Sequence, residues 1–152
     1  MMRMKPPEPM REALAEAEAA ARRGEVPVGC VIVDRSGGMI AKAGNRTIEL
    51  ADTTAHAEML AIRAAAAAVG SERLTGCDVY VTLEPCAMCA AAMSFARISR
   101  LYFGAADPKM GAVENGVRFF AQASCHHRPD VYGGIGEEQA AMLLKDFFKS
   151  RR

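Results

Sequence analysis

The chain has 152 residues, of which 51% are hydrophobic and 24% charged, and its 19 basic residues nearly balance 18 acidic ones. This length suffices for one domain with a substantial core, and the composition is that of an ordinary globular protein. The net charge of +1 excludes a surface that is basic throughout, so any nucleic-acid contact has to come from a local patch. We expect a single domain over residues 1–152, with poor order over residues 1–9.

Helical and strand patterns alternate along the chain. An alanine- and glutamate-rich segment predicts a first helix that ends at Gly24, and valine-rich segments bounded by turns predict strands. The predicted elements are a helix over 11–23, strands over 26–33 and 39–43, a helix over 56–69, a strand over 78–83, a helix over 86–96, a strand over 98–103, a short helix around 115–119, a strand over 130–132 and a helix over 137–152. This alternation predicts an α/β fold of three layers with a mixed sheet.

Local signals predict where the two central helices begin and end. Thr53 or Thr54 can cap the helix over 56–69, and Gly70 can end it in the left-handed conformation that glycine tolerates. Pro85 suits the first position of the next helix, because a proline there loses no hydrogen bond.

His56 and Glu58, followed by Cys86 and Cys89, form the most informative motif of the chain. One imidazole and two thiolates are ligands that suit Zn²⁺. Three protein ligands leave a fourth tetrahedral position for water, which distinguishes a catalytic zinc from a structural one. Cys86 and Cys89 share one face at the start of their predicted helix, where the helix N-terminus favours thiolate over thiol. The motif therefore predicts a catalytic zinc site.

Glu58 is the acid placed to move protons in such a site. Zinc lowers the pKa of its bound water to about 7, so hydroxide is available at neutral pH. A nearby carboxylate can accept the water proton and then protonate a ring nitrogen and the departing amine of a nucleobase. The pattern H-x-E followed by P-C-x-x-C is the signature of zinc-dependent nucleobase deaminases, so it predicts Glu58 as the catalytic residue.

Two other interpretations of the paired cysteines stay open at this point. They could belong to a structural zinc knot or to a reduced redox pair. A structural knot needs a fourth protein ligand, and the remaining candidates are Cys30, Cys77, Cys125, His126 and His127. None of these has a partner spacing that indicates a role, so the catalytic interpretation is favoured.

Beyond the zinc motif, the chain resembles bacterial tRNA adenosine deaminases, which convert the wobble adenosine of an anticodon to inosine. The resemblance is carried by residues 24–29, 44–46, 54–58, 82–86, 103–109 and 147–152. The zinc motif alone is shared by the wider cytidine-deaminase-like superfamily, whereas the flanking segments favour the tRNA enzymes. The resemblance implies a cytidine-deaminase-like α/β/α fold with a central five-stranded mixed sheet flanked by helices.

The resemblance also implies a set of substrate contacts. They are Asn45, Val26, Leu83, Asp107, Lys109 and Phe148. Asn45 would read an edge of the base between apolar walls, and Asp107 would accept a hydrogen bond from a ribose 2′-hydroxyl. From the residues alone, a turn residue and a pocket residue are equally good interpretations of Asn45, and an Asp beside a proline, such as Asp107, is usually a turn former. Of Phe147 and Phe148, one is expected in the core and the other near the splayed anticodon.

The resemblance further implies one Zn²⁺ per subunit, a homodimer, and the tRNA anticodon stem-loop as partner. Five cysteines without a secretory signal favour a cytoplasmic setting, and the longest apolar run, over 64–69, is too short to cross a membrane. Two alternatives remain. A guanine, cytosine or nucleotide deaminase would use the same zinc site without a basic, aromatic C-terminal helix. An RNA-binding or scaffold protein would have a fourth protein ligand on a structural zinc.

Overall fold

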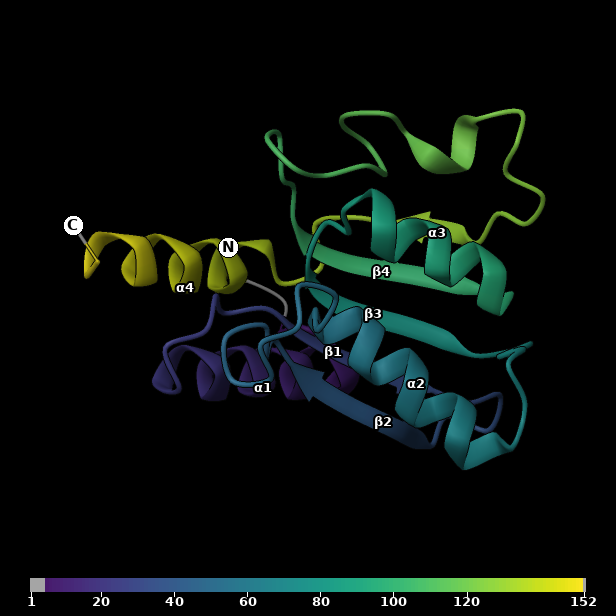
Figure 1. Cartoon of the computed structure of the whole chain (residues 1–152), viewed down its shortest axis with the longest axis horizontal. Coiled ribbons are helices and arrows are strands. Elements are labelled where there is room, and N and C mark those ends of the chain that lie inside the picture. Colours follow the sequence, from purple (N-terminus) through teal and green to yellow (C-terminus); the bar gives the residue numbers. More distant parts are fainter. Residues whose placement is uncertain (1–4, 152) are drawn as a thin grey trace.

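The computed structural model describes residues 5–151 and has a five-stranded sheet at its centre (Figure 1). Its elements are α1 (Glu8–Arg22), β1 (Gly29–Val33), β2 (Met39–Gly44), α2 (Ala57–Val69), β3 (Asp78–Leu83), α3 (Ala87–Ala96), β4 (Arg100–Ala105), the 3₁₀ helix η1 (Phe119–Ala121), β5 (Asp130–Tyr132) and α4 (Glu137–Lys149). The strands lie in the order β2-β1-β3-β4-β5. Strand β1 is antiparallel to β2 and β3, whereas β3, β4 and β5 are parallel, so the predicted mixed sheet is confirmed.

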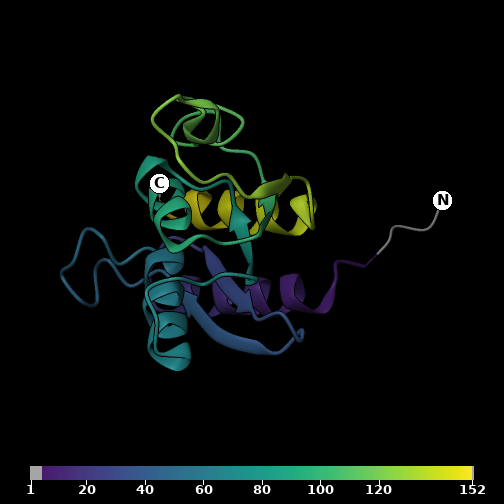
Figure 2. The ribbon, with the colours of Figure 1, turned by 90° about the vertical axis from the view of Figure 1, so that its right-hand side faces the viewer.

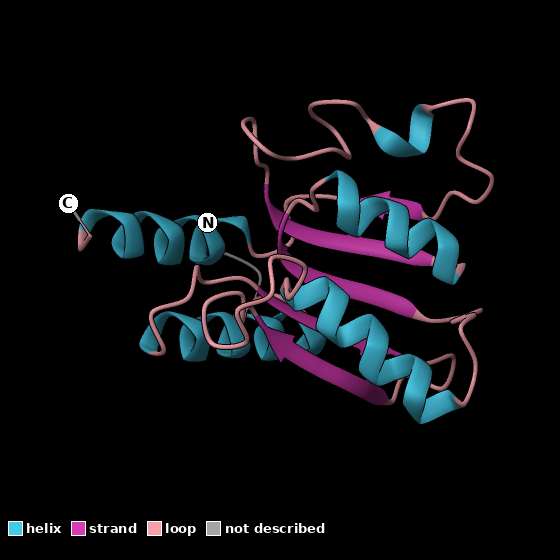
Figure 3. Ribbon diagram, viewed as in Figure 1, coloured by secondary structure: helices cyan, strands magenta, loops and turns pink. Residues whose placement is uncertain are grey.

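Helices cover both faces of this sheet (Figures 2 and 3). Helices α1 and α4 pack on one face, and α2 and α3 pack on the strands from the other side. Strand β1 is buried along its whole length, which explains why its sequence carries no alternating polar residues. Cys30 and Ile32 of β1 join the core beneath α2 and α3, whereas Val31 joins the core beneath α1. The predicted three-layer arrangement is confirmed.

Helix α1 and strand β1 begin at residues other than those predicted. Helix α1 starts earlier, at Glu8, because Pro9 is pre-set for a first helical turn and Glu8 places negative charge at the helix N-terminus. Strand β1 starts later, at Gly29, because the N–H of Val28 donates to the carbonyl of Val26 (2.8 Å) rather than to a neighbouring strand. The expectation of poor order over the first nine residues falls partly outside the described residues, which begin at residue 5.

The predicted start of α3 was also wrong by a small shift. Cys86 is its N-cap, so Pro85 precedes the cap instead of occupying the first helical turn. The short helix expected around 115–119 lies at Phe119–Ala121. Gly70 ends α2 with a φ of 73°, so its prediction as a left-handed helix stop is confirmed.

The three tyrosines of the chain form one stack across β3, β4 and β5. The ring centroids of Tyr80 and Tyr102 are 4.4 Å apart, and those of Tyr102 and Tyr132 are 5.0 Å apart. The strand register places these residues directly beside one another. Aromatic pairs on neighbouring strands stabilise strand pairing, so the stack supports the parallel half of the sheet.

Gly29 lies where β1 passes closest to α1. A Cβ atom there would lie 1.9 Å from the carbonyl oxygen of Ala13 and 2.6 Å from the amide nitrogen of Ala17. Gly29→Ala is therefore expected to force α1 away from the sheet and to lower the free energy of unfolding by about 1–3 kcal/mol or more, as measured by urea denaturation. Gly38→Ala is the matched control, because a Cβ there meets no atom closer than 3.5 Å. Equal losses in both variants would contradict a packing cause.

Candidate active site

His56, Cys86 and Cys89 converge where the N-termini of α2 and α3 meet. His56 is the N-cap of α2, Cys86 is the N-cap of α3, and Cys89 lies in the first turn of α3. His56 Nδ1 lies 3.7 Å from Cys86 Sγ and 3.5 Å from Cys89 Sγ. All three potential ligand atoms lie within 4.8 Å of one another. The structure therefore brings the three predicted ligands into one cluster.

The spacing of these atoms fits a tetrahedral zinc ion. With Zn–S distances of about 2.3 Å and Zn–N distances of about 2.0–2.1 Å, neighbouring ligand atoms on a tetrahedron are about 3.6 Å apart. The two nitrogen–sulfur distances match this edge. Within residues 5–151, no fourth His, Cys, Asp or Glu joins the cluster. The donor set thus suits a catalytic zinc with one open position better than a structural zinc.

The two thiols of the cluster differ in their protonation. The hydrogen bond from the Cys89 thiol, together with the contact with His56, lowers the pKa of Cys86 to about 4. The pKa of Cys89 is raised because its thiol donates in this pair. The hydrogen bond with Cys86 raises the pKa of His56. Cys86 is therefore held as a thiolate, the form in which cysteine binds a metal.

Glu58 lies buried in the first turn of α2, with 4% of its surface exposed. Burial raises the pKa of its carboxyl group to about 7. Glu58 lines the same cavity as His56 and Cys86 but does not belong to the ligand cluster. This position allows the carboxyl group to exchange protons with a water molecule at the open ligand position.

A cavity of about 260 Å³ opens beside the ligand cluster. Its lining combines His56, Glu58 and Cys86 with the predicted substrate residues Val26, Asn45, Leu83 and Asp107. Sequence reasoning missed four further lining residues, which are Val28, Thr47, Glu84 and Met110. None of the four is a predicted ligand, and their only signal was proximity in sequence to the predicted site residues Val26, Asn45, Leu83 and Asp107.

A larger groove of about 600 Å³ adjoins this cavity. The two share the lining residues Val26, Leu83, Asp107 and Met110. Lys109 and Phe148 line the groove but not the cavity, so these two predicted contacts lie beside the metal cluster rather than at it. Phe148 is 50% exposed, whereas Phe147 is 9% exposed and packs in the interior, as expected of one member of this pair.

The Asn45 side chain caps helix α2 from the loop that follows β2. Its Oδ1 atom accepts a hydrogen bond from the N–H of Ala57 at 2.8 Å. The predicted threonine caps were wrong, because the amide and hydroxyl of Thr54 donate instead to Asp52, at 2.8 and 2.7 Å. Asn45 therefore connects the cavity wall to the helix start that carries His56 and Glu58.

Asp107 closes its own turn at the edge of the groove. Its Oδ1 atom accepts from the N–H groups of Lys109 (3.1 Å) and Met110 (3.0 Å). The turn interpretation of this residue is therefore confirmed. The Oδ2 atom takes no part in this turn, which leaves the carboxylate with an acceptor for a ligand in the groove.

The other cysteines and His127 lie outside the metal cluster, buried in the interior or in contacts between loop and helix. Cys30, Cys77 and Cys125 are buried free thiols. The hydroxyl of Ser94 donates to the carbonyl of His127 at 2.7 Å and lies 3.5 Å from Cys125 Sγ. His127 Nε2 lies 2.6 Å from the carbonyl oxygen of Ile98. These contacts tie the segment after η1 to the end of α3.

The chain is similar to known proteins in both sequence and fold. Residues 5–105 match the cytidine and deoxycytidylate deaminase zinc-binding region. The chain is 61% identical over 143 residues to a tRNA-specific adenosine deaminase of Agrobacterium fabrum, covering 94% of this chain and 93% of that relative.

Two solved structures are similar to the chain in fold. One, from studies of A-to-I editing by tRNA:A34 deaminases at the wobble position, superposes with a TM-score of 0.88 at 62% identity, covering 90% of this chain and 98% of the other. A guanine deaminase from Nitrosomonas europaea shares the fold with a TM-score of 0.81 but only 22% identity, covering 96% of this chain and 86% of the other. By its zinc-binding region and its identity along nearly the whole chain, the protein belongs to the tRNA-specific adenosine deaminase family of zinc-dependent deaminases.

Proposed function

We propose that this chain hydrolytically deaminates the wobble adenosine of a tRNA anticodon, giving inosine and ammonia. The observation that carries the proposal is a three-ligand metal site beside a buried glutamate, in a cavity that continues into a larger groove. A sequence identity of 61% to a tRNA-specific adenosine deaminase, over 94% of this chain, supports tRNA rather than a free base as the substrate.

The cluster residues and Glu58 divide the chemistry between them. His56, Cys86 and Cys89 hold one zinc ion per subunit, and this ion, when bound, supplies the Lewis acidity that makes water nucleophilic at neutral pH. Glu58 accepts a proton from the attacking water and delivers it to the adenine ring nitrogen beside the reacting carbon. A second proton passes through Glu58 to the departing amine. Water is consumed, ammonia leaves, and Glu58 returns to its starting form.

The cavity receives the target base. A base has to leave its stack before its amino-bearing carbon can reach the metal, and an anticodon loop lowers that cost because it is single-stranded. Val26 and Leu83 provide apolar walls for the base, and Asn45 provides a polar group for its edge.

The adjoining groove receives the neighbouring nucleotides. Phe148 presents a half-exposed ring on which a base can stack, and Lys109 adds a positive charge near the phosphates. Asp107 accepts a hydrogen bond from a ribose 2′-hydroxyl through the oxygen that its turn does not use.

The proposal also includes the oligomeric state of the protein and its place in the cell. The family likeness supports a homodimer and a cytoplasmic site of action. Within residues 5–151, none of the helices is both long and apolar enough to cross a membrane.

The proposed function is tested by incubating the zinc-loaded protein with a tRNA bearing a wobble adenosine and searching the nuclease digest for inosine by mass spectrometry. We expect inosine at that position and none in a matched tRNA with guanosine there. The same assay with free guanine, cytosine and adenosine tests the small-molecule alternative. Deamination of a free base, with no inosine formed in the tRNA, would overturn the proposal in favour of that alternative.

A further inference from the structure

Two buried carboxylates lie at the cavity but outside the ligand cluster: Glu84 is one of the lining residues, and Glu25 lies behind the wall. Glu25 and Glu84 are 1% and 2% exposed. Glu25 immediately precedes the wall residue Val26, and Glu84 immediately follows the wall residue Leu83. Because a buried carboxylate is costly unless it is hydrogen-bonded, the partners of these two groups show what each one holds in place.

Glu84 holds two separate parts of the loop between β4 and η1. Its Oε1 atom accepts from the N–H of Asp107 (2.9 Å) and from the side-chain amide of Asn115 (2.7 Å). Its Oε2 atom accepts at 2.8–3.0 Å from the backbone N–H groups of Val113, Glu114 and Asn115. The loop packs so closely on this carboxylate that a Cβ at Gly111 would lie 2.5 Å from Glu84 Cδ.

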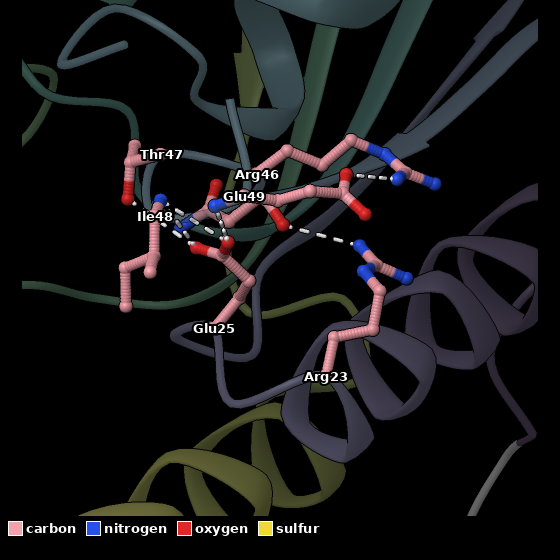
Figure 4. Close-up of polar contacts among 7 residues, drawn as sticks. Arg23, Glu25, Arg46, Thr47, Ile48 and Glu49 are labelled. Atoms are coloured by element: carbon pink, nitrogen blue, oxygen red, sulfur yellow. Dashed lines mark hydrogen bonds and ion pairs between the residues drawn. The ribbon is translucent and has the colours of Figure 1, made fainter. Parts of the chain in front are cut away.

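Glu25 holds the loop that follows β2 in a similar way (Figure 4). Its carboxylate accepts hydrogen bonds from the Thr47 hydroxyl (3.3 Å), the Ile48 N–H (3.1 Å) and the Glu49 N–H (2.9 Å). Arg23, at the end of α1, reaches the same loop and donates to the carbonyl of Asn45 at 3.1 Å. Asn45 and Thr47 line the cavity, so this side of the cavity is fastened to the end of α1.

The donors to both carboxylates are chiefly backbone amides, joined by one hydroxyl and one carboxamide. The position of a backbone N–H group is fixed by the conformation of the backbone. The hydrogen bonds to each carboxylate can therefore form only in one conformation of its loop. A loop that moved away would leave a buried charge without hydrogen bonds, which is strongly unfavourable. Burial raises the pKa of Glu25, but the backbone hydrogen bonds outweigh it and hold that pKa below its ordinary value.

We propose that Glu25 and Glu84 are positioning residues that hold the two loops bordering the cavity in the conformation that receives the substrate. Glu25 orients Asn45 and Thr47, and Glu84 orients Asp107. The consequence for catalysis rests on the proposed function. A single-stranded substrate is itself flexible and has to be ordered when it binds. A pocket whose loops are already fixed adds no further loss of conformational entropy, so binding is more favourable.

Amide hydrogen exchange tests the anchoring without any substrate. Glu25→Gln keeps the shape of the side chain but turns an amide donor toward backbone donors. We expect exchange in the segment 47–49 to accelerate about tenfold or more, with the segment 113–115 unchanged. Glu84→Gln should give the reciprocal result. Circular dichroism and zinc content establish that each variant is folded and loaded.

Matched controls come from exposed glutamates on the same two loops. Glu49 forms an exposed ion pair with Arg46, and the side chain of Glu114 is exposed. Glu49→Gln and Glu114→Gln remove the same charge without touching the buried carboxylates, so we expect wild-type exchange in both. If a buried variant does not fold, Thr47→Val and Asn115→Ala each remove one donor instead, and each should accelerate exchange severalfold in its own loop.

Steady-state kinetics on the tRNA substrate then separate positioning from general stability. Glu84→Gln is expected to raise KM about tenfold with kcat within about twofold of wild type, because its loop contacts nucleotides that do not react. Glu25→Gln is expected to lower kcat as well, because its loop carries Asn45 beside the reacting base. Unchanged exchange in both loops, equal effects of the exposed controls, or faster exchange with unaltered kinetics would each overturn the proposal. A wild-type protein inactive on tRNA would refute the proposed function, while the exchange results would still decide whether the carboxylates hold the loops.

Discussion

Replacing Glu58 with glutamine is expected to lower kcat/KM by about 10²–10⁴-fold while zinc stays bound. Glutamine has nearly the same shape as glutamate but cannot accept and return a proton. Glu58 lines the cavity beside His56 and Cys86 without being one of the clustered ligands, so the metal site should survive the change. Inosine formation under single-turnover conditions measures the rate, and metal analysis of the same sample measures the zinc. Glu58→Ala is expected to behave in the same way.

The control for this variant is Glu72→Gln. Glu72 follows α2 with its side chain 87% exposed, so neutralising it should leave both rate and zinc unchanged. A Glu58→Gln enzyme that keeps more than about a tenth of the wild-type rate would exclude the proton shuttle. Loss of zinc together with rate would assign Glu58 to the support of the metal instead.

Removing a ligand should produce the second large effect. Cys86→Ala and His56→Ala are each expected to weaken zinc binding by more than about 100-fold, since even residues that only support a ligand cost about 10–100-fold. Activity should be lost in proportion to the zinc. The melting temperature should also fall, because zinc joins the starts of α2 and α3 and its binding energy contributes to folding. Metal analysis, inosine formation and thermal melts check these three outcomes.

Cys77→Ala separates the role of the ligands from the general effect of losing a buried thiol. Cys77 is 4% exposed and packs in the core, outside the metal cluster. Its replacement should cost about 1 kcal/mol of stability and leave zinc and activity intact. Full zinc occupancy in Cys86→Ala or His56→Ala would contradict their assignment as ligands.

The metal site could be predicted from the sequence because its residues lie close together in sequence within each pair. His56 and Glu58 are two positions apart, Cys86 and Cys89 three apart, and each pair lies at a helix start. The helix stop at Gly70 was equally local, since a left-handed residue after an alanine run favours glycine. Strand β1 was recognisable by its continuous apolar residues.

The loops around the cavity could not be predicted because their partners are distant in sequence. Glu25 bonds residues 22 to 24 positions away, and Glu84 bonds residues 23 to 31 positions away. The cap of α2 likewise comes from Asn45, twelve positions before Ala57, rather than from an adjacent threonine. A glutamate beside an apolar strand end looks like a surface residue until the fold brings backbone amides around it.

The tyrosine stack gives this protein a local optical probe. The chain has no tryptophan and only three tyrosines, all of them in the stack across β3, β4 and β5. Tyrosine emission and near-ultraviolet dichroism therefore report chiefly on the pairing of these three strands, whereas far-ultraviolet dichroism is dominated by the helices. Coincident unfolding curves from the two signals would show that the parallel half of the sheet and the helical layers melt as one unit. An earlier change in the tyrosine signal would show that the pairing of these three strands is lost before the helical layers unfold.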